Sequence, residues 1–255
     1  MDKDALLTQW QKEEKAGISG WDFSRLAGRW YNDPLPWHYK KIVRDHLRRN
    51  DHLLDMGTGG GELLRSFHHD PALTSVTEAW EPNVKLLEGT LAQRGVAVYA
   101  VPKDEPAQLP VPDASQDIIL NSHAAFDADL IFSKLKPGGL FITEQVGATN
   151  NFALSRFLVP DYTPAFPDNT MLHTVAAFDH AGMEIIQADT AHPTMTFFDV
   201  GAVVYYASII QWEFPGFSVA QAKDQLFVLQ GLIETHRRIV TKEDRFLVMA
   251  RKPSR

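Results

Sequence analysis

The sequence predicts an α/β fold built on a mostly parallel sheet with helices on both faces. Short apolar runs, each ended by turn residues, alternate with helical stretches between residues 52 and 146. Two further apolar runs, at 183–189 and 245–251, bring the expected strands to seven. A composition of 44% apolar and 22% charged residues over 255 positions is typical of a globular protein with a full core.

The expected elements follow one another in a regular order. Two helices, over residues 4–15 and 38–50, come before the first strand. The first five strands are expected at 52–56, 75–79, 96–101, 117–121 and 140–146, with helical stretches such as GELLRSFHH and NVKLLEGTLAQRG between them. The segment before the last strand contains FFDVGAVVYYASIIQWEFPGFS and an expected helix near 219–237. Because the last strand follows that helix with little connector, we expect it to be antiparallel, in a hairpin added at the sheet edge.

The composition excludes several kinds of chemistry. The chain contains no cysteine, so it has no disulfide, no cysteine-ligated zinc or iron–sulfur cluster and no cysteine nucleophile. The first residues, MDKDALLTQWQKEEKAG, are polar, and no run reaches the roughly 18 consecutive apolar residues of a membrane helix. We therefore expect a cytoplasmic protein that does not enter membranes.

The net charge of −7 is unevenly distributed. Residues 1–50 carry 10 basic and 7 acidic side chains, residues 51–200 carry 7 and 20, and residues 201–255 carry 8 and 5. A nucleic-acid-binding protein usually shows a basic face, so the acidic middle argues against a nucleic-acid substrate. Because the two ends of the chain are mildly basic, an RNA substrate stays an alternative.

The most specific motif is LLDMGTGGGE at residues 53–62. A strand ends with an acid, Asp55, and a glycine-rich turn then leads into a helix. Glycines allow positive φ and leave no Cβ between backbone and ligand, while the helix start offers free amide donors. The turn can therefore carry a small nucleotide-like ligand.

The spacing of the glycines narrows the choice of ligand. A dinucleotide fingerprint, G-x-G-x-x-G, counted from Gly57, needs a small residue where this chain has Glu62. The phosphate loop of nucleoside triphosphatases also fails, because no Gly-Lys-Ser/Thr follows. The remaining pattern, G-x-G-x-G after an acid, resembles the first motif of class I S-adenosylmethionine-dependent methyltransferases.

The resemblance extends over residues 50–147 and includes Glu78 at a strand end, LPVPDASQDIILNSHAAF and LKPGGLFITEQVG. It implies a Rossmann-like fold with seven strands and S-adenosylmethionine as cofactor. No linker-like segment divides the chain, so we expect one methyltransferase domain with an N-terminal helical cap (1–50), a cofactor-binding core (51–190), an insertion or lid (191–243) and a final strand (244–255). The flanking segments are similar to those of a bacterial branch whose acceptor is unknown.

The resemblance also implies cofactor-binding roles. Asp55 would reach the cofactor ammonium, Glu78 would hold the ribose hydroxyls, and Asn121 would lie near the sulfonium. An acid meeting the adenine amine could be Asp104 or Glu105, between which the sequence does not decide. The remaining expected cofactor contacts are Gly57, Thr58, Gly59, Gly61, Ala79 and Trp80.

The residues that would bind or deprotonate the methyl acceptor are less well defined. His123 lies just past a strand's carboxyl end and could accept the nucleophile's proton, although a lone histidine is often structural. Glu144 could point into the site or cap the sheet. Aromatic residues in the cap and in the insertion could contact an acceptor or belong to the core: Trp37, Tyr205 and Trp212.

These residues predict an enzyme that transfers the sulfonium methyl group in line to a small-molecule acceptor, without a metal. Positioning alone lowers such a barrier by roughly 7–11 kcal/mol, so few catalytic side chains are needed. The alternatives are an RNA methyltransferase and a cofactor-binding relative without transfer activity. A dehydrogenase ranks below both. The sequence departs from amino-purine methyltransferases at 121–124, where it reads NSHA.

Overall fold

The computed structural model describes residues 2–18, 22–102 and 109–254, which form two compact units. Unit 1 comprises residues 1–35, 147–169 and 191–245. Unit 2 comprises residues 36–146, 170–190 and 246–255. The prediction of a single domain with a cap, a core and an insertion stays a prediction.

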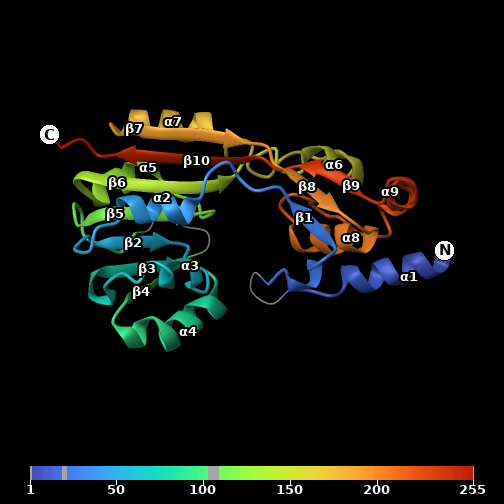
Figure 1. Cartoon of the computed structure of the whole chain (residues 1–255), viewed down its shortest axis with the longest axis horizontal. Helices are drawn as coiled ribbons and strands as arrows, with labels where there is room; N and C mark the ends of the chain where they lie inside the picture. The colour runs from blue at the N-terminus through green and yellow to red at the C-terminus, as the bar shows by residue number, and fades with distance from the viewer. Residues whose placement is uncertain (1, 19–21, 103–108, 255) are drawn as a thin grey trace. The chain divides into compact units, whose positions relative to one another are not determined.

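Unit 2 is built on a seven-stranded sheet in the order β4-β3-β2-β5-β6-β10-β7 (Figure 1). The strands β2, β3, β4, β5 and β6 are mutually parallel, and the arrow of β10 runs opposite to those of β6 and β7 in Figure 1. This confirms the predicted mostly parallel sheet with an antiparallel last strand. The strand bounds are β2 Leu53–Met56, β3 Thr74–Glu78, β4 Ala97–Ala100, β5 Gln116–Ser122, β6 Leu135–Val146, β7 Glu184–Ala191 and β10 Arg245–Arg251.

One sequence expectation about the sheet is wrong. The last strand is not at the edge, because β10 lies between β6 and β7 and leaves β7 outermost. Burial explains the placement. The five residues Phe246 to Ala250 are all at most 4% exposed, as an inner strand requires, whereas β7 alternates between exposed and partly buried positions.

Both faces of the sheet are covered. Side chains alternate between the faces along a strand, so Leu54 and Leu53 point to opposite sides, yet both are fully buried. Leu54 belongs to a cluster that includes Ile131 of α5 and Phe178 of α7. On α2, Tyr39 donates its hydroxyl to the Ile142 carbonyl oxygen at 3.0 Å. The helices of unit 2 are α2 Tyr39–His46, α3 Glu62–Arg65, α4 Glu81–Thr90, α5 Ala128–Lys134 and α7 Met171–His180, with short 3-10 turns at Pro71–Leu73 and Ala92–Arg94.

The helix expected over 38–50 ends four residues early, at His46. Leu47 has extended backbone angles, and the Arg48 amide donates to the Asp51 carboxylate at 2.8 Å. This side-chain hydrogen bond offers the backbone a turn in place of another helical turn. Residues 47–52 therefore form a loop that leads into β2.

Unit 1 is organised around α8 (Val200–Ile209), whose residues from Val200 to Ala207 are all buried. A helix that is apolar all round belongs in a core. Asp199 caps its first turn by accepting from the Ala202 amide, and Arg29 joins Asp199 to Glu13 of α1. A three-stranded antiparallel sheet, β1-β8-β9, which the sequence did not predict, completes the unit. The bounds in unit 1 are α1 Lys3–Glu14, β1 Trp30–Asn32, α6 Phe152–Leu158, β8 Thr194–Phe197, α9 Lys223–His236 and β9 Ile239–Lys242, with a 3-10 turn at Ser24–Leu26.

Candidate functional site

The predicted glycine turn lies in unit 2 between β2 and α3. Gly57, Gly59 and Gly61 have φ values of +64°, +62° and +76°, in the left-handed region that favours glycine. A Cβ on Gly57 would lie 2.6 Å from the Cβ of Ala124, so that side of the turn is packed. A Cβ on Gly59 would meet nothing within 4 Å. The backbone at Gly59 therefore faces open space in which a ligand could approach.

Glu78 closes the turn from the end of β3. Its Oε2 accepts from the Gly59 amide at 2.8 Å, and its Oε1 accepts from the amides of Ala79 and Trp80 at 2.8 and 2.9 Å. The residue is only 7% exposed. An ionised carboxylate has about four acceptor positions, so three amides leave capacity for a hydroxyl donor. Trp80 itself is 45% exposed, which leaves its ring accessible beside the strand end.

Asp55 is a second buried carboxyl at the same sheet edge. It is 4% exposed, and its Oδ2 accepts from the Thr58 hydroxyl at 2.6 Å. Burial raises the pKa of Asp55 to about 7, the Thr58 hydrogen bond opposes that rise, and the nearby charge of Glu78 adds to it. A cation beside Asp55 would therefore be strongly favoured, because it would stabilise a charge that the protein alone holds poorly.

Asn121, near the end of β5, carries an unpaired donor. The residue is fully buried, and its Oδ1 accepts from Gln145 Nε2 at 2.7 Å and from the Thr143 hydroxyl at 3.2 Å. Its Nδ2 has no hydrogen-bond partner in the structure. A buried donor without a partner costs about 1–3 kcal/mol, which a bound ligand or water at this position would offset.

Three side chains come together next to Asn121: the predicted His123 and Trp37, and Glu144, whose place the sequence left open. His123 follows β5 in a left-handed conformation with φ +69°, and its Nε2 lies 3.9 Å from Oε1 of Glu144. The other carboxylate oxygen of Glu144 accepts from the Trp37 indole N–H at 2.7 Å. The arrangement depends on register, because Ser122 pairs with Glu144 across β5 and β6 and the His123 amide donates to the Glu144 carbonyl oxygen. Strained backbone conformations of this kind cluster at functional sites.

Known structures share this architecture. A candidate methyltransferase from Bacillus halodurans is 18% identical, with a TM-score of 0.56 over 84% of this chain and 98% of its own. The YcgJ protein of Bacillus subtilis is 17% identical, with a TM-score of 0.56 over 85% of this chain and 98% of its own. The chain has the class I methyltransferase fold. No family model and no curated protein matches the sequence.

The class I methyltransferase fold does not by itself decide the reaction. The cyclase SpnF is similar too, at 17% identity and a TM-score of 0.50, over 97% of this chain and 93% of its own. Its name describes a different reaction on the same fold. The chemistry of this chain must therefore be argued from its own side chains.

The other predicted residues are placed as follows. Asp104 and Glu105 lie outside the described residues. Tyr205 is 2% exposed in the core of unit 1, where its ring centroid lies 5.5 Å from the Arg25 guanidinium carbon. Trp212 is 40% exposed on unit 1. Their contact with an acceptor stays a prediction, and the burial of Tyr205 leaves it almost no accessible surface.

The sequence leaves open whether Glu144 points into the site or caps the sheet, and it does not predict the contributions of Thr77 and Gln145. Thr77 accepts from the Gly57 amide at 3.3 Å, and Gln145 orients Asn121. The signal for Glu144 and Gln145 was their position at the carboxyl end of β6, which is the ligand-binding edge of such sheets.

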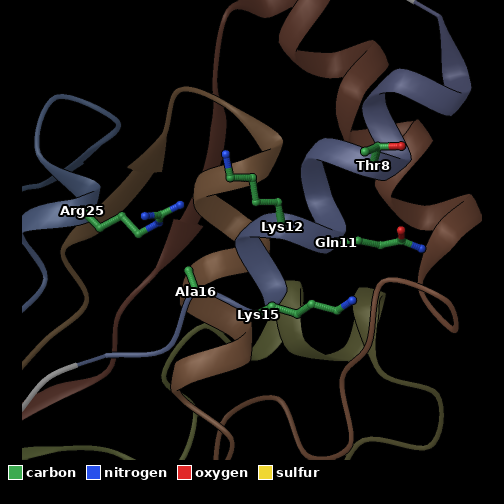
Figure 2. Close-up of a pocket in the computed structure, with 6 residues that line it drawn as sticks. All are labelled: Thr8, Gln11, Lys12, Lys15, Ala16 and Arg25. Atoms are coloured by element: carbon green, nitrogen blue, oxygen red, sulfur yellow. The ribbon is translucent and has the colours of Figure 1, made fainter.

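A hollow of about 530 Å³ lies in unit 1 (Figure 2). Figure 2 shows that Lys12 and Lys15 direct their ammonium groups to different sides, so the hollow offers no common focus for a ligand.

In the described ranges, no group of three His, Asp or Glu side chains could hold a metal ion. No helix within those ranges is long and apolar enough to cross a membrane.

Proposed function

We propose that the protein is an S-adenosylmethionine-dependent methyltransferase acting on a small-molecule acceptor. The observation that supports this most is the turn at Gly59, open on its Cβ side and held by the buried carboxylate of Glu78. The structure offers a cofactor of this kind three matched groups. Glu78, at the end of β3, has spare acceptor capacity. Asp55, in β2, is a buried carboxyl that a cation would stabilise. Asn121, in β5, carries an unpaired amide donor.

The binding roles follow from these groups. Glu78 would accept from the ribose hydroxyls, Asp55 would face the ammonium, and Trp80 would offer its exposed ring to the adenine. The Nδ2 of Asn121 would donate to the amino-acid part or to the acceptor. The cofactor, when bound, would supply a methyl group on a sulfonium, which is already electrophilic. The chain would then need to orient the acceptor, exclude water and take up a proton.

The cluster of His123 supports proton transfer from the acceptor. Its Nε2 lies 3.9 Å from the Glu144 carboxylate, and an imidazole in this position could accept the proton of the nucleophile. Glu144 would stabilise the imidazolium that forms, and the Trp37 indole N–H would keep Glu144 in place. The methyl group would go to a hydroxyl or amine nucleophile, and its proton would go to His123.

Calorimetry with S-adenosylmethionine tests the cofactor assignment. Gly59→Asp should abolish binding because its side chain fills the open space, and Glu78→Ala should weaken it at least about tenfold. Gly89→Asp is the matched control, since a Cβ on Gly89 in α4 also meets nothing within 4 Å. Wild-type protein that gives no binding heat would overturn the proposal.

The acceptor class needs a second experiment. Labelled cofactor offered to fractionated metabolites and to RNA should label a small molecule. Label in RNA would favour the RNA alternative instead. Cofactor binding without any labelled product would favour a relative that has lost transfer activity.

A further inference from the structure

A second hollow in unit 2, of about 440 Å³, is formed by the two loops that precede β2 and β3. The glycine turn follows these strands, so the hollow lies at the opposite edge of the sheet. Four residues of β2, spanning roughly 13 Å, separate the two edges. The residues that line this hollow are Leu47, Arg48, Arg49, Phe67, His68, His69, Asp70 and Pro71.

Hydrogen bonds join the two loops into one wall. Arg44 of α2 donates from Nη2 to the Ser66 carbonyl oxygen at 2.8 Å. His69 Nε2 lies 2.8 Å from the Asp51 carbonyl oxygen. A carbonyl only accepts, so His69 must carry its proton on Nε2, which leaves Nδ1 as the nitrogen available elsewhere. The hollow is thus held by hydrogen bonds from the side chains of Arg44 and His69 to main-chain carbonyl oxygens.

The charged groups of the hollow are predominantly basic. Arg48 and Arg49 are exposed, and their guanidinium groups make no hydrogen bond or ion pair in the described chain. One acid, Asp70, lines the hollow as well, but its Oδ1 is occupied in accepting from the Ala72 amide at 3.0 Å. Two permanent positive charges and the imidazole of His68 thus line the hollow together with one carboxylate, while the nearby Asp51 carboxylate accepts from the Arg48 amide.

The lining combines these cations with an apolar floor. Leu47, Phe67 and Pro71 each contribute partly buried apolar surface. Guanidinium groups bind phosphate oxygens in pairs, with charge-assisted hydrogen bonds. A phosphate monoester carries about −1.5 to −2 charges, which two arginines can match, and its organic part can pack on Phe67.

We propose that this hollow binds the phosphate group of a small phosphorylated organic molecule. The site is separate from the glycine turn, and it does not depend on the methyl-transfer assignment. It gives the protein a second ligand, recognised through Arg48 and Arg49 and oriented by Phe67.

Calorimetric titration of the full chain with phenyl phosphate tests the proposal. We expect saturable binding below about 10 mM, and the double variant Arg48→Gln/Arg49→Gln should weaken it at least about tenfold. The matched control is Lys12→Gln/Lys15→Gln, which removes the same charge from the hollow of unit 1 and should leave the affinity within about twofold. Thermal unfolding would show that both variants remain folded.

Three outcomes would overturn the proposal. The first is wild-type protein without saturable binding, and the second is equal affinity in the wild type and the arginine variant. The third uses a single-stranded uridine oligonucleotide as a separate probe. Tighter binding of that RNA than of phenyl phosphate, lost in the arginine variant, would assign the hollow to a nucleic-acid backbone instead.

Discussion

Cofactor binding should be linked to the titration of Asp55. The free protein holds this carboxyl with a pKa of about 7 because the side chain is buried. A bound ammonium next to it would favour the charged form and return the pKa toward its ordinary value of 3.8. Binding would then release a proton near neutral pH, so affinity should rise as the pH rises through 7.

The magnitude follows from the two pKa values. At about pH 6 roughly nine tenths of the free protein has Asp55 protonated, whereas at about pH 8 only about one tenth does. Binding at the lower pH must include the free energy of deprotonation. We therefore expect the apparent affinity for S-adenosylmethionine to increase about tenfold, or ~1.4 kcal/mol, between these two pH values.

The assay is calorimetry at both pH values, in two buffers that differ in ionisation enthalpy so that released protons are counted. The cofactor's own amine also titrates, and Asp55→Asn separates the two effects because that contribution remains in the variant. Asp55→Asn should bind more weakly at about pH 8 and lose the tenfold pH effect. Asp113→Asn, at an exposed ion pair with Lys134, is the control and should behave like the wild type.

A wild-type affinity that is flat between about pH 6 and pH 8 would refute the reasoning about Asp55. So would an equal pH effect in Asp55→Asn. Either result would mean that Asp55 does not change its protonation when the ligand binds.

Three other outcomes are expected. Gly57→Ala should lower the free energy of unfolding by about 1–3 kcal/mol, because the added Cβ would lie 2.6 Å from that of Ala124 and φ is +64°; Gly89→Ala should not destabilise. Glu144→Gln should lower the transfer rate about 10- to 100-fold with unchanged cofactor affinity, measured by turnover and calorimetry. Burial raises the pKa of Glu213 to about 7, so the folded state keeps a proton that the unfolded chain loses near 4.5. The resulting stability, about 3 kcal/mol, is complete below the unfolded pKa and lost as the pH rises through 7. Buried Asp55 contributes to the same slope, so Glu213→Gln should remove only the share of Glu213 in denaturant unfolding.

Each of these expectations has a contrary result. Equal destabilisation by alanine at both glycines would show that the close approach at Ala124 is unimportant. A full transfer rate in Glu144→Gln would limit that residue to a structural contribution. An equal fall in stability between about pH 5 and pH 8 in the wild type and in Glu213→Gln would contradict a proton held by Glu213.

Sequence patterns predicted the parts of the fold that depend on neighbouring residues. The strand at Leu53–Met56 and its glycine turn are local, because an apolar run followed by residues that need positive φ specifies both. The β1-β8-β9 sheet escaped prediction because three- and four-residue strands carry little periodic signal, and Trp30 pairs with the distant Phe197. The position of β10 between β6 and β7 is likewise set by burial rather than by the length of a connector.

The residues of the candidate site also fall into those that local sequence predicts and those that depend on distant pairing. The residues of the glycine turn could be found from their spacing in the chain. Contact between His123, Glu144 and Trp37 could not, because it depends on the register of β5 against β6 and on where the segment before α2 crosses the sheet. Period-two patterns show which side chains share a face, but they do not identify the residue that lies opposite.

The interleaving of the two units constrains how the protein is made. The chain passes between them five times, at residues 35, 146, 169, 190 and 245. Neither unit is therefore complete on the ribosome until nearly the whole chain has emerged. Until β10 arrives, β6 and β7 each expose an unpaired strand edge, which is a template for aggregation. The nascent protein should therefore depend on chaperones late in translation, and excising either unit as a contiguous fragment should fail.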